Sequence, residues 1–280
     1  MTSTTPRTNA TRPDLSSIAL WAGISIAILV GILPVTLHAQ QTPKSKPTVV
    51  LVHGAFAGSS SWNPVVARLL ARGYPVIAVA NPLRGVKSDA SYLASTLDSI
   101  TGPVILVGHS YGGNVISVAA TGKSNVKALV YVSGLAPDLG ETASALVGKF
   151  PGSTLGPTLA PPVALADGGK DLYILQDKFH AQFCADVPAG EAKVMAATQR
   201  PINAAAFDEP AGEPAWKTIP SWFLYASLDK NIPPAVHAFL AKRANAKKTV
   251  EIQGASHVVM ISHPDALVKL IDEAATATMK

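Results

Sequence analysis

Ser110 lies at the centre of a Gly-x-Ser-x-Gly pattern formed by residues 108–112. An apolar run at 103–108 precedes the serine, and an apolar stretch at 114–120 follows it. This context predicts a sharp strand-to-helix turn, on which the hydroxyl projects above a sheet and glycines relieve the crowding. The following helix would point its positive end at the serine. The bare pattern also suits an ordinary glycine-rich turn, but with a strand before it and a helix after it we predict that Ser110 is a nucleophile.

A serine hydroxyl is too weak an acid to attack unaided, so it needs a base, usually a histidine held by a carboxylate. The histidines that follow it in the chain are His180, His237, His257 and His263. His257 comes a short turn after the strand predicted at 248–252, which places it just beyond the carboxyl edge of the sheet. We predict that His257 is the base. For His180 and His237 we expect surface or packing roles, and for His263 a structural role at a helix start.

The carboxylate partner is expected between the serine and the histidine in the chain, in the loop after a strand. Asp229 fits, because it follows the apolar run at 221–226 and precedes His257 by 28 residues. Asp138, after the run at 126–132, is the competing candidate. Its place directly after a proline is typical of a turn residue. We therefore predict that Asp229 orients the imidazole of His257 and stabilises its charged form.

The negative oxygen that forms during acyl transfer needs backbone N–H donors. One is expected from Tyr111, the residue after the nucleophile, and the other from the loop after the first strand. In that loop Gly54 permits a close approach, and we predict the N–H of Ala55 as the donor, with that of Phe56 second. We expect Phe56, Tyr111 and Trp62 to contact the substrate, although Trp62 also suits a packing role.

Apolar, β-branched runs alternate with helical stretches along most of the chain, which is typical of parallel strands joined by helices. The strands are expected at 48–53, 74–80, 103–108, 126–132, 221–226 and 248–252. The helices are expected at 63–72, 89–100, 114–120, 234–244 and 265–275, and near 171–183 and 189–197. We predict an α/β protein with a mostly parallel sheet and helices on both faces. Its core is residues 48–136 and 217–280, and residues 137–216, where the alternation fails, form an inserted helical cap or lid.

The N-terminal segment carries no charged side chain at 15–43 and is almost wholly apolar at 18–37. Arginines precede it, and Ala39 ends a sequence that resembles a cleavage site. We expect residues 1–39 to be a cleaved signal peptide, followed by a polar linker at 40–47, and hence a periplasmic or secreted protein. The alternative is a membrane anchor at 18–37, since that run approaches the length that spans a bilayer.

The composition excludes several classes of function. Hydrophobic residues make up 48% of the 280 residues and charged residues 15%, which excludes a disordered chain. The 23 Lys+Arg and 18 Asp+Glu are scattered, so the net charge of +5 is not a nucleic-acid footprint. The single cysteine excludes an intrachain disulfide, and Gly122-Lys123-Ser124 lacks the earlier glycine of a phosphate-binding loop. We expect no cofactor, no metal, no nucleic acid, a small-molecule ester as partner, and no membrane contact unless the leader is retained.

Five segments of the chain resemble the α/β-hydrolase superfamily. They are VLVHGAFAGSSSW at 50–62, VILVGHSYGG at 104–113, SGLAPDLGE at 133–141, SLDKNIP at 227–233 and GASHVVMISHP at 254–264. The first and third are most similar to the small methylesterase and hydroxynitrile-lyase group and its bacterial esterase relatives. The resemblance implies the α/β-hydrolase fold, with Ser110, Asp229 and His257 in the roles described above.

The resemblance also separates esterases from lyases. Lyases of that group carry threonine after the first-strand histidine and lysine directly after the catalytic histidine, whereas this chain has Gly54 and Val258. It therefore implies a serine esterase that cleaves a small or medium carboxylic ester, and an apolar cap favours an apolar acyl or alcohol part. The alternatives are a cofactor-free perhydrolase or lyase on the same triad, and a non-catalytic binding module on this fold. Because a histidine base must be neutral, activity should rise through pH ~6.5, the ordinary range for imidazole.

Overall fold

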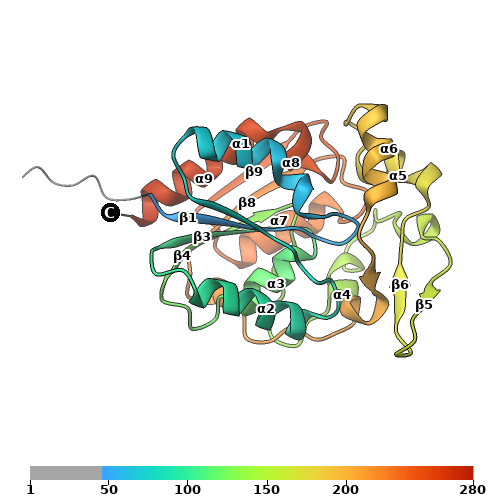
Figure 1. The fold of residues 1–280 in the computed structure, drawn as a ribbon, viewed down its shortest axis with the longest axis horizontal. Coiled ribbons are helices and arrows are strands. Elements are labelled where there is room, and N and C mark those ends of the chain that lie inside the picture. The colour runs from blue at the N-terminus through green and yellow to red at the C-terminus, as the bar shows by residue number, and fades with distance from the viewer. Residues whose placement is uncertain (1–45, 280) are drawn as a thin grey trace, which may run out of the picture. The chain divides into compact units, whose positions relative to one another are not determined.

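A six-stranded sheet forms the centre of the molecule (Figure 1). The structure is a computed structural model that describes residues 46–279. In spatial order the strands are β2 (Val76–Val79), β1 (Thr48–Val52), β3 (Val104–His109), β4 (Val126–Val132), β8 (Ser221–Ala226) and β9 (Lys248–Ile252). Each pair of neighbouring strands is parallel. The predicted α/β class with a mostly parallel sheet is therefore confirmed.

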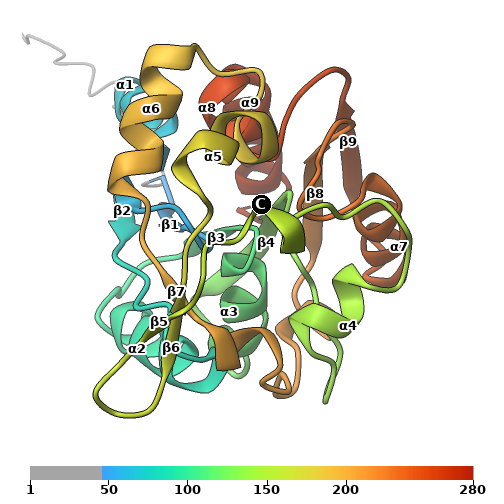
Figure 2. The same ribbon diagram turned by 90° about the vertical axis from the view of Figure 1, so that its right-hand side faces the viewer.

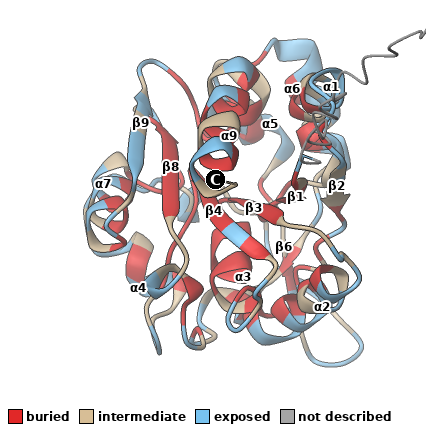
Figure 3. Ribbon diagram, turned by 90° about the vertical axis from the view of Figure 1, so that its left-hand side faces the viewer, coloured by how far each residue is buried: buried red, intermediate tan, exposed pale blue. Residues whose placement is uncertain are grey.

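The central strands are buried because their sequences are almost wholly apolar. Every residue of β3 and of β8 is buried, and Figure 3 shows the same for most of β4. A strand that is covered by helices on both faces needs no polar side, which is why these runs show no alternation. The edge strands β2 and β9 include exposed residues, since one side of each has no neighbouring strand.

Helices cover both faces of the sheet (Figure 1). On one face α1 (Asn63–Ala71) packs beside α9 (Pro264–Thr278), and on the other α2 (Val86–Asp98) packs beside α3 (Gly112–Ala119). A further helix, α7 (Pro234–Arg243), packs against β8. The helices α1, α7 and α9 each have a proline in the first turn, where the missing N–H has no intrahelical partner to lose.

The chain reverses its direction of winding at β1. It passes from β1 to β2 on one side, then returns across β1 to β3 and continues outward through β4, β8 and β9. In a parallel sheet a crevice opens at such a reversal, outside the carboxyl ends of the two strands. Ser110 directly follows β3, and the loop 53–58 directly follows β1. The topology thus places the predicted nucleophile beside the predicted oxyanion loop.

The segment 137–216 lies beyond the carboxyl ends of the strands (Figures 1 and 2). Its helices are α4 (Ala143–Val147), α5 (Gln176–Phe183) and α6 (Ala189–Thr198). It also contains an antiparallel sheet of β5 (Val163–Ala164), β6 (Lys170–Leu172) and β7 (Ile202–Asn203). The helix predicted near 171–183 begins only at Gln176, because residues 170–172 pair as a strand. Strands of two or three residues are too short to leave a periodic pattern.

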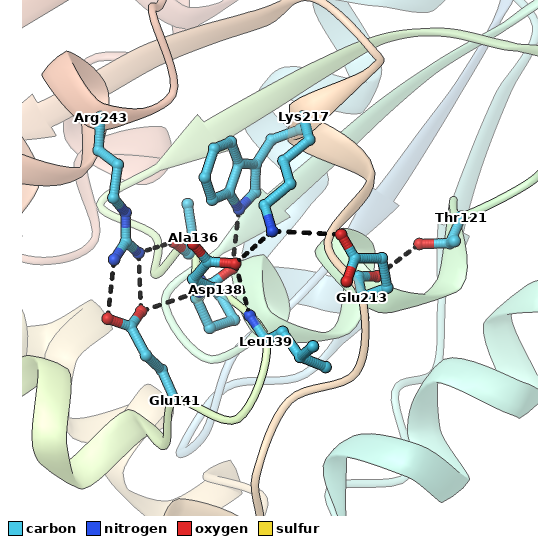
Figure 4. Close-up of polar contacts among 10 residues, drawn as sticks. Thr121, Ala136, Asp138, Leu139, Glu141, Glu213, Lys217 and Arg243 are labelled. Atoms are coloured by element: carbon cyan, nitrogen blue, oxygen red, sulfur yellow. Dashed lines mark hydrogen bonds and ion pairs between the residues drawn. The ribbon is translucent and has the colours of Figure 1, made fainter.

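Polar contacts join the two ends of this segment (Figure 4). The residues that make these contacts lie at the base of the segment, and we call them the base cluster. They are Asp138, Glu141, Glu213, Trp216, Lys217 and Arg243. The indole Nε1 of Trp216 donates a hydrogen bond of 2.7 Å to Pro137 O. The Nζ of Lys217 lies 2.7 Å from Oδ1 of Asp138. The start and the end of the segment are therefore fixed to each other.

The predicted leader lies outside the described residues. This applies to the signal peptide at 1–39, to the alternative anchor at 18–37 and to most of the linker at 40–47. Within residues 46–279, no helix combines the length and the hydropathy that a membrane crossing requires. A one-turn helix, α8 (Val259–Ser262), precedes α9, and short 3-10 helices lie at Ser59–Trp62, Gly156–Thr158, Ala204–Phe207 and Ala215–Lys217.

Candidate active site

Ser110 stands on a tight turn between β3 and α3. Its φ of 54° lies in the left-handed region, which residues other than glycine rarely adopt. The Ser110 N–H donates to Val132 O at 3.1 Å, and Ser110 O accepts from the N–H groups of Gly113 and Leu135 at 2.9 and 3.1 Å. Strain of this kind costs about 1–3 kcal/mol and persists where surrounding contacts hold it, as is common at active sites.

Two glycines give this turn its room. A Cβ at Gly112 would lie 2.5 Å from Val52 O, and a Cβ at Gly54 would lie 2.6 Å from the Cβ of Ser110. A side chain at either position would therefore force the backbone of β1 and that of the serine turn apart. The close approach explains why glycine stands at both positions.

Asp229 and His257 form a short hydrogen bond in the interior. The Nδ1 of His257 lies 2.6 Å from Oδ2 of Asp229, and the two side chains are 1% and 0% exposed. The other oxygen, Oδ1, accepts from the N–H groups of Asn231 and Ile232 at 2.8 and 3.0 Å. Because an ionised carboxylate only accepts, the proton of the pair sits on Nδ1 and leaves Nε2 as an acceptor. An imidazole held in this way is prepared to take a proton.

A second histidine, His237 of α7, contacts the same carboxylate. Its Nε2 lies 3.3 Å from Oδ2 of Asp229, and its ring stacks on Tyr225 with centroids 5.3 Å apart. Burial alone would raise the pKa of Asp229, but the charge of His257 and the hydrogen bonds from both histidines outweigh burial and hold that pKa well below its ordinary value. The sequence pattern misses this role of His237, because the contact depends on how α7 packs against β8.

Ser110 and His257 line one cavity of about 320 Å³. Its other walls are mainly apolar and come from both the core and the segment 137–216. They include Leu135, Val147, Leu155, Leu159, Phe183, Phe207 and Ile232. The Nε2 of His257 is buried and has no hydrogen-bond partner within the described part of the chain. This nitrogen, which would take the serine proton, is therefore hydrogen-bonded neither to Ser110 nor to another described group.

Neighbouring rings fix the plane of His257. Its ring centroid lies 4.7 Å from that of His109 and 5.2 Å from that of Phe183. Burial lowers the pKa of His109 well below its ordinary value, so this ring is neutral. Its Nε2 lies 3.1 Å from the backbone oxygen of His257, which accepts a hydrogen bond from it. Packing therefore holds both the ring and the backbone of His257.

Two backbone N–H groups are available for an oxyanion. Those of Ala55 and Tyr111 donate no hydrogen bond to any described residue, and both residues line the cavity with Ser110. The N–H of Phe56, predicted as the second choice, donates instead to Arg200 O at 3.0 Å. Arg200 belongs to the segment 137–216, far from Phe56 in the chain, so the sequence around Phe56 carries no sign that its N–H already has an acceptor. The backbone N–H groups of Ala55 and Tyr111 are thus the ones that remain free to bind an oxyanion.

His53 fixes the loop that carries Ala55. Its Nε2 accepts the N–H of Asn81 at 3.1 Å, so its Nδ1 carries the proton and donates to Gly54 O at 2.9 Å. The amide Nδ2 of Asn81 donates in turn to His53 O at 2.9 Å. These bonds tie the loop after β1 to the loop after β2 and hold Ala55 in place.

Comparisons with known proteins agree with this architecture. Residues 49–270 match the alpha/beta hydrolase family. The chain belongs to this family. An alpha/beta hydrolase of Aspergillus novofumigatus is 25% identical to it over 250 residues, which cover 82% of this chain and 97% of the relative. The alpha-hydroxynitrile lyase of Arabidopsis thaliana is 27% identical over 252 residues, with the same coverage of 82% and 97%.

A solved structure shows the same fold. The crystal structure of polyneuridine aldehyde esterase aligns with a TM-score of 0.71 at 19% identity, covering 81% of this chain and 98% of that one. The predicted α/β-hydrolase fold and the resemblance to the hydroxynitrile-lyase group are therefore confirmed. Together, the named relatives support an activity of the hydrolase or lyase type on this fold.

The residues expected to contact substrate in this α/β-hydrolase occupy different places. Phe56 and Tyr111 line the cavity. Trp62 is fully buried outside the lining, and its ring packs edge-on against His109 with centroids 6.3 Å apart. The hydroxyl of Tyr111 donates to Oδ2 of the buried Asp89 at 3.0 Å. Trp62 therefore supports the site from behind, in line with the packing alternative.

The remaining reactive side chains of the hydrolase lie apart from the cavity. Asp138 belongs to the base cluster and faces Lys217 instead of a histidine. His180 hydrogen-bonds to a backbone oxygen of its own segment, and His263 to the neighbouring Ser262 hydroxyl. Cys184 is buried, and burial raises the pKa of its thiol to about 12. Within residues 46–279, no group of three or more His, Cys, Asp or Glu is placed to hold a metal ion.

Proposed function

We propose that this α/β-hydrolase is a serine esterase that cleaves a carboxylic ester through an acyl-Ser110 intermediate. The observation that carries the proposal is the buried Asp229–His257 pair, whose histidine lines the same cavity as Ser110 and keeps Nε2 unpartnered. A nucleophile, a base and an orienting carboxylate in one site are what acyl transfer requires. Gly54 and Val258 further favour the esterase over the lyase pattern.

In the first half-reaction the Oγ of Ser110 attacks the carbonyl carbon of the ester, and its proton passes to Nε2 of His257. The N–H groups of Ala55 and Tyr111 stabilise the negative carbonyl oxygen. The carbon–oxygen bond to the alcohol then breaks, and His257 gives its proton to the departing oxygen. Asp229 stays ionised and stabilises the imidazolium.

The second half-reaction removes the acyl group with water. His257 takes a proton from the water molecule, and the oxygen of that water attacks the carbonyl carbon of the acyl-enzyme. The bond to Oγ breaks, the proton returns to Ser110, and a carboxylic acid leaves. The two half-reactions add one water molecule to one ester and restore the starting protonation of Ser110 and His257.

The cavity favours a neutral, mainly apolar substrate of small or medium size. Besides Ser110 and His257, the lining residues with polar side chains are Ser144, Ser153, Asn231 and Tyr111, whose hydroxyl is hydrogen-bonded to Asp89. No Asp, Glu, Lys or Arg is among the described residues that line the cavity. A charged acyl group would lose its hydration there without gaining a partner. We therefore place an uncharged acyl or alcohol part against the apolar wall.

Labelling with a fluorophosphonate tests the activated nucleophile directly. We expect one probe per chain on wild type and none on Ser110→Ala, read by intact-protein mass spectrometry. Ser133→Ala is the matched control, because Ser133 follows β4 as Ser110 follows β3, also has a positive φ, and keeps a buried hydroxyl without a partner. This control should label as fully as wild type.

Hydrolysis of p-nitrophenyl esters of increasing acyl length then defines the substrate. We expect neutral acyl groups to be cleaved and charged acyl groups of equal size to be cleaved at least about tenfold more slowly, since one unpaired buried charge costs well over 1.4 kcal/mol. Absence of labelling on folded wild type would refute the esterase. A rate that stays flat between pH 5 and 8 would also contradict a histidine base.

A further inference from the structure

We propose that His237 is a positioning residue of the active site. In this role it donates a second hydrogen bond to Oδ2 of Asp229 and thereby limits how strongly the carboxylate attracts the proton of His257. Its kinetic consequence rests on the esterase function proposed above, whereas its effect on His257 does not. The observations that carry it are the contacts around one carboxylate and the burial of both imidazoles.

The carboxylate of Asp229 is surrounded by four donors. Its Oδ1 accepts two backbone N–H bonds, from Asn231 and Ile232. Its Oδ2 accepts from His257 at 2.6 Å and from His237 at 3.3 Å. Two donors on each oxygen use the full accepting capacity of a carboxylate and leave it no free direction in which to rotate. The bond from His237 is the longer and weaker of the two hydrogen bonds on Oδ2. It therefore modifies the bond to His257 without replacing it.

The protonation of His237 follows from its partner. Because Oδ2 can only accept, the Nε2 of His237 carries a proton. Its Nδ1 is buried and has no hydrogen-bond partner among the described residues. A buried polar atom without a partner is unfavourable, so an apolar ring would serve a packing role on Tyr225 better than histidine does. The imidazole therefore gains from its contact with Asp229.

Few ionisable groups face His237. The described ones in contact with it are Asp229, on the loop after β8, and Tyr225, on β8 itself. Burial, followed by the charge of Glu251, raises the pKa of Tyr225, so that phenol is neutral. Asp229 is thus the charged group with which His237 interacts, and through it His237 is coupled to His257.

The sign of the coupling follows from charge sharing. With His237 present, the negative charge on Oδ2 is divided between two N–H donors. Without it, that charge acts on His257 alone and favours the imidazolium, so the titration midpoint of His257 moves to higher pH. Loss of one hydrogen bond of ordinary strength corresponds to a shift of about 0.5–1 pH unit. The carboxylate also gains freedom to rotate, which lowers kcat.

Two variants distinguish the effect of the N–H donor of His237 from that of its aromatic ring. His237→Phe keeps an aromatic ring on Tyr225 but removes the N–H. His237→Gln keeps an amide N–H that reaches about as far as Nε2 and does not titrate. Phe239→Leu is the control, because it loosens the packing of the same helix without touching Asp229.

The titration midpoint of His257, followed by NMR of isotope-labelled imidazoles, is the deciding measurement. We expect a rise of about 0.5–1 pH unit in His237→Phe, and values within about 0.2 of wild type in His237→Gln and Phe239→Leu. The acid limb of kcat/KM should move with the NMR midpoint. The kcat of His237→Phe should fall about tenfold with KM unchanged, since His237 does not line the cavity.

An unchanged midpoint in His237→Phe would overturn the proposal whatever the activity, and so would an equal shift in His237→Gln. If His237→Phe does not fold, His237→Met removes the donor with a more adaptable side chain and decides the same question. Failure of the esterase is recognised separately, as folded wild type that does not react with the fluorophosphonate. In that case the NMR midpoints still decide whether His237 modifies Asp229.

Discussion

Asp229 and Asp138 follow neighbouring parallel strands, β8 and β4, yet their surroundings differ completely. The side chain of Asp229 is 0% exposed and faces two histidines. That of Asp138 is 36% exposed and faces Lys217, which is 40% exposed (Figure 4). An aspartate that follows a strand of this sheet can therefore belong either to the candidate site or to the base cluster. The side chains that it contacts determine which of these roles it has.

The partners differ in whether they can exchange a proton near neutral pH. Imidazole changes its charge between about pH 5 and 8, so a carboxylate beside it can stabilise a charge that appears and disappears in each turnover. Lysine and arginine keep their charge throughout that range. In the base cluster Arg243 donates two hydrogen bonds to Glu141, at 2.7 and 2.8 Å, which is a lasting structural contact. The environment of Asp229 suits catalysis, whereas that of the base cluster suits holding the segment 137–216 in place.

Replacing Asp229 should give the largest effect. In Asp229→Asn the amide cannot accept from both histidines, so His257 is driven to the tautomer with its proton on Nε2 and cannot take the proton of Ser110. We expect kcat/KM for a p-nitrophenyl ester to fall about 10³–10⁴-fold, as for other triads that lose the orienting carboxylate. Asp138→Asn should retain activity within about threefold. Equal losses in the two variants would show that the two carboxylates do not differ in function.

As the pH is lowered, His53 beside the candidate site and Asp138 in the base cluster should reduce the free energy of unfolding in different pH ranges. Burial lowers the pKa of His53 to about 4, although its bond to Gly54 opposes the shift. Between pH ~6.5 and ~4 the unfolded chain therefore binds the proton and the folded chain does not, so stability falls as the pH drops through that window, by about 3 kcal/mol from His53. The bond to Lys217 lowers the pKa of Asp138, so its contribution is present above pH ~3.9 and is lost only below it.

Urea unfolding of two variants between pH 4 and 7 checks this difference. We expect His53→Gln, whose amide oxygen can still accept the N–H of Asn81, to lose much of the slope between pH 6.5 and 4. Some slope should remain, because burial lowers the pKa of His109 in the same direction. Asp138→Asn should keep the slope of wild type. A wild-type stability that is constant across this window would contradict neutral, buried histidines at the site.

The local sequence pattern was sufficient to predict the sheet and the approximate position of the candidate site. The strands β4, β8 and β9 have the predicted bounds, because each is a short stretch rich in β-branched or aromatic residues that ends at turn residues. Parallel strands all end at one edge, so residues that follow them meet there whatever their distance in the chain. That rule explains why Ser110 and His257 line one cavity, and why Asp229 bonds to His257.

Contacts between distant segments were not predictable in this way. The N–H of Phe56 donates to the backbone oxygen of Arg200, and Trp62 is buried with its ring edge-on to that of His109. His237 lies on a helix with a weakly amphipathic sequence, and only the packing of α7 on β8 turns it toward Asp229. Each of these depends on which surfaces meet, and hydrophobic periodicity describes a single element at a time.

The smallest expected effect is the contribution of Asp138 to stability. Asp138→Asn removes the ion pair with Lys217 but keeps an oxygen that can accept the N–H of Leu139, which lies 2.7 Å from Oδ1. Because both charged groups are about two-fifths exposed, water and salt screen their attraction. We expect the free energy of unfolding to fall by less than about 1 kcal/mol at low salt and by close to nothing in 1 M NaCl. A loss above about 2 kcal/mol, or one that salt leaves unchanged, would mean that the base cluster behaves as a buried network. Burial would then not explain why Asp138 and Asp229 have different roles, and the histidine partners of Asp229 alone would have to explain it.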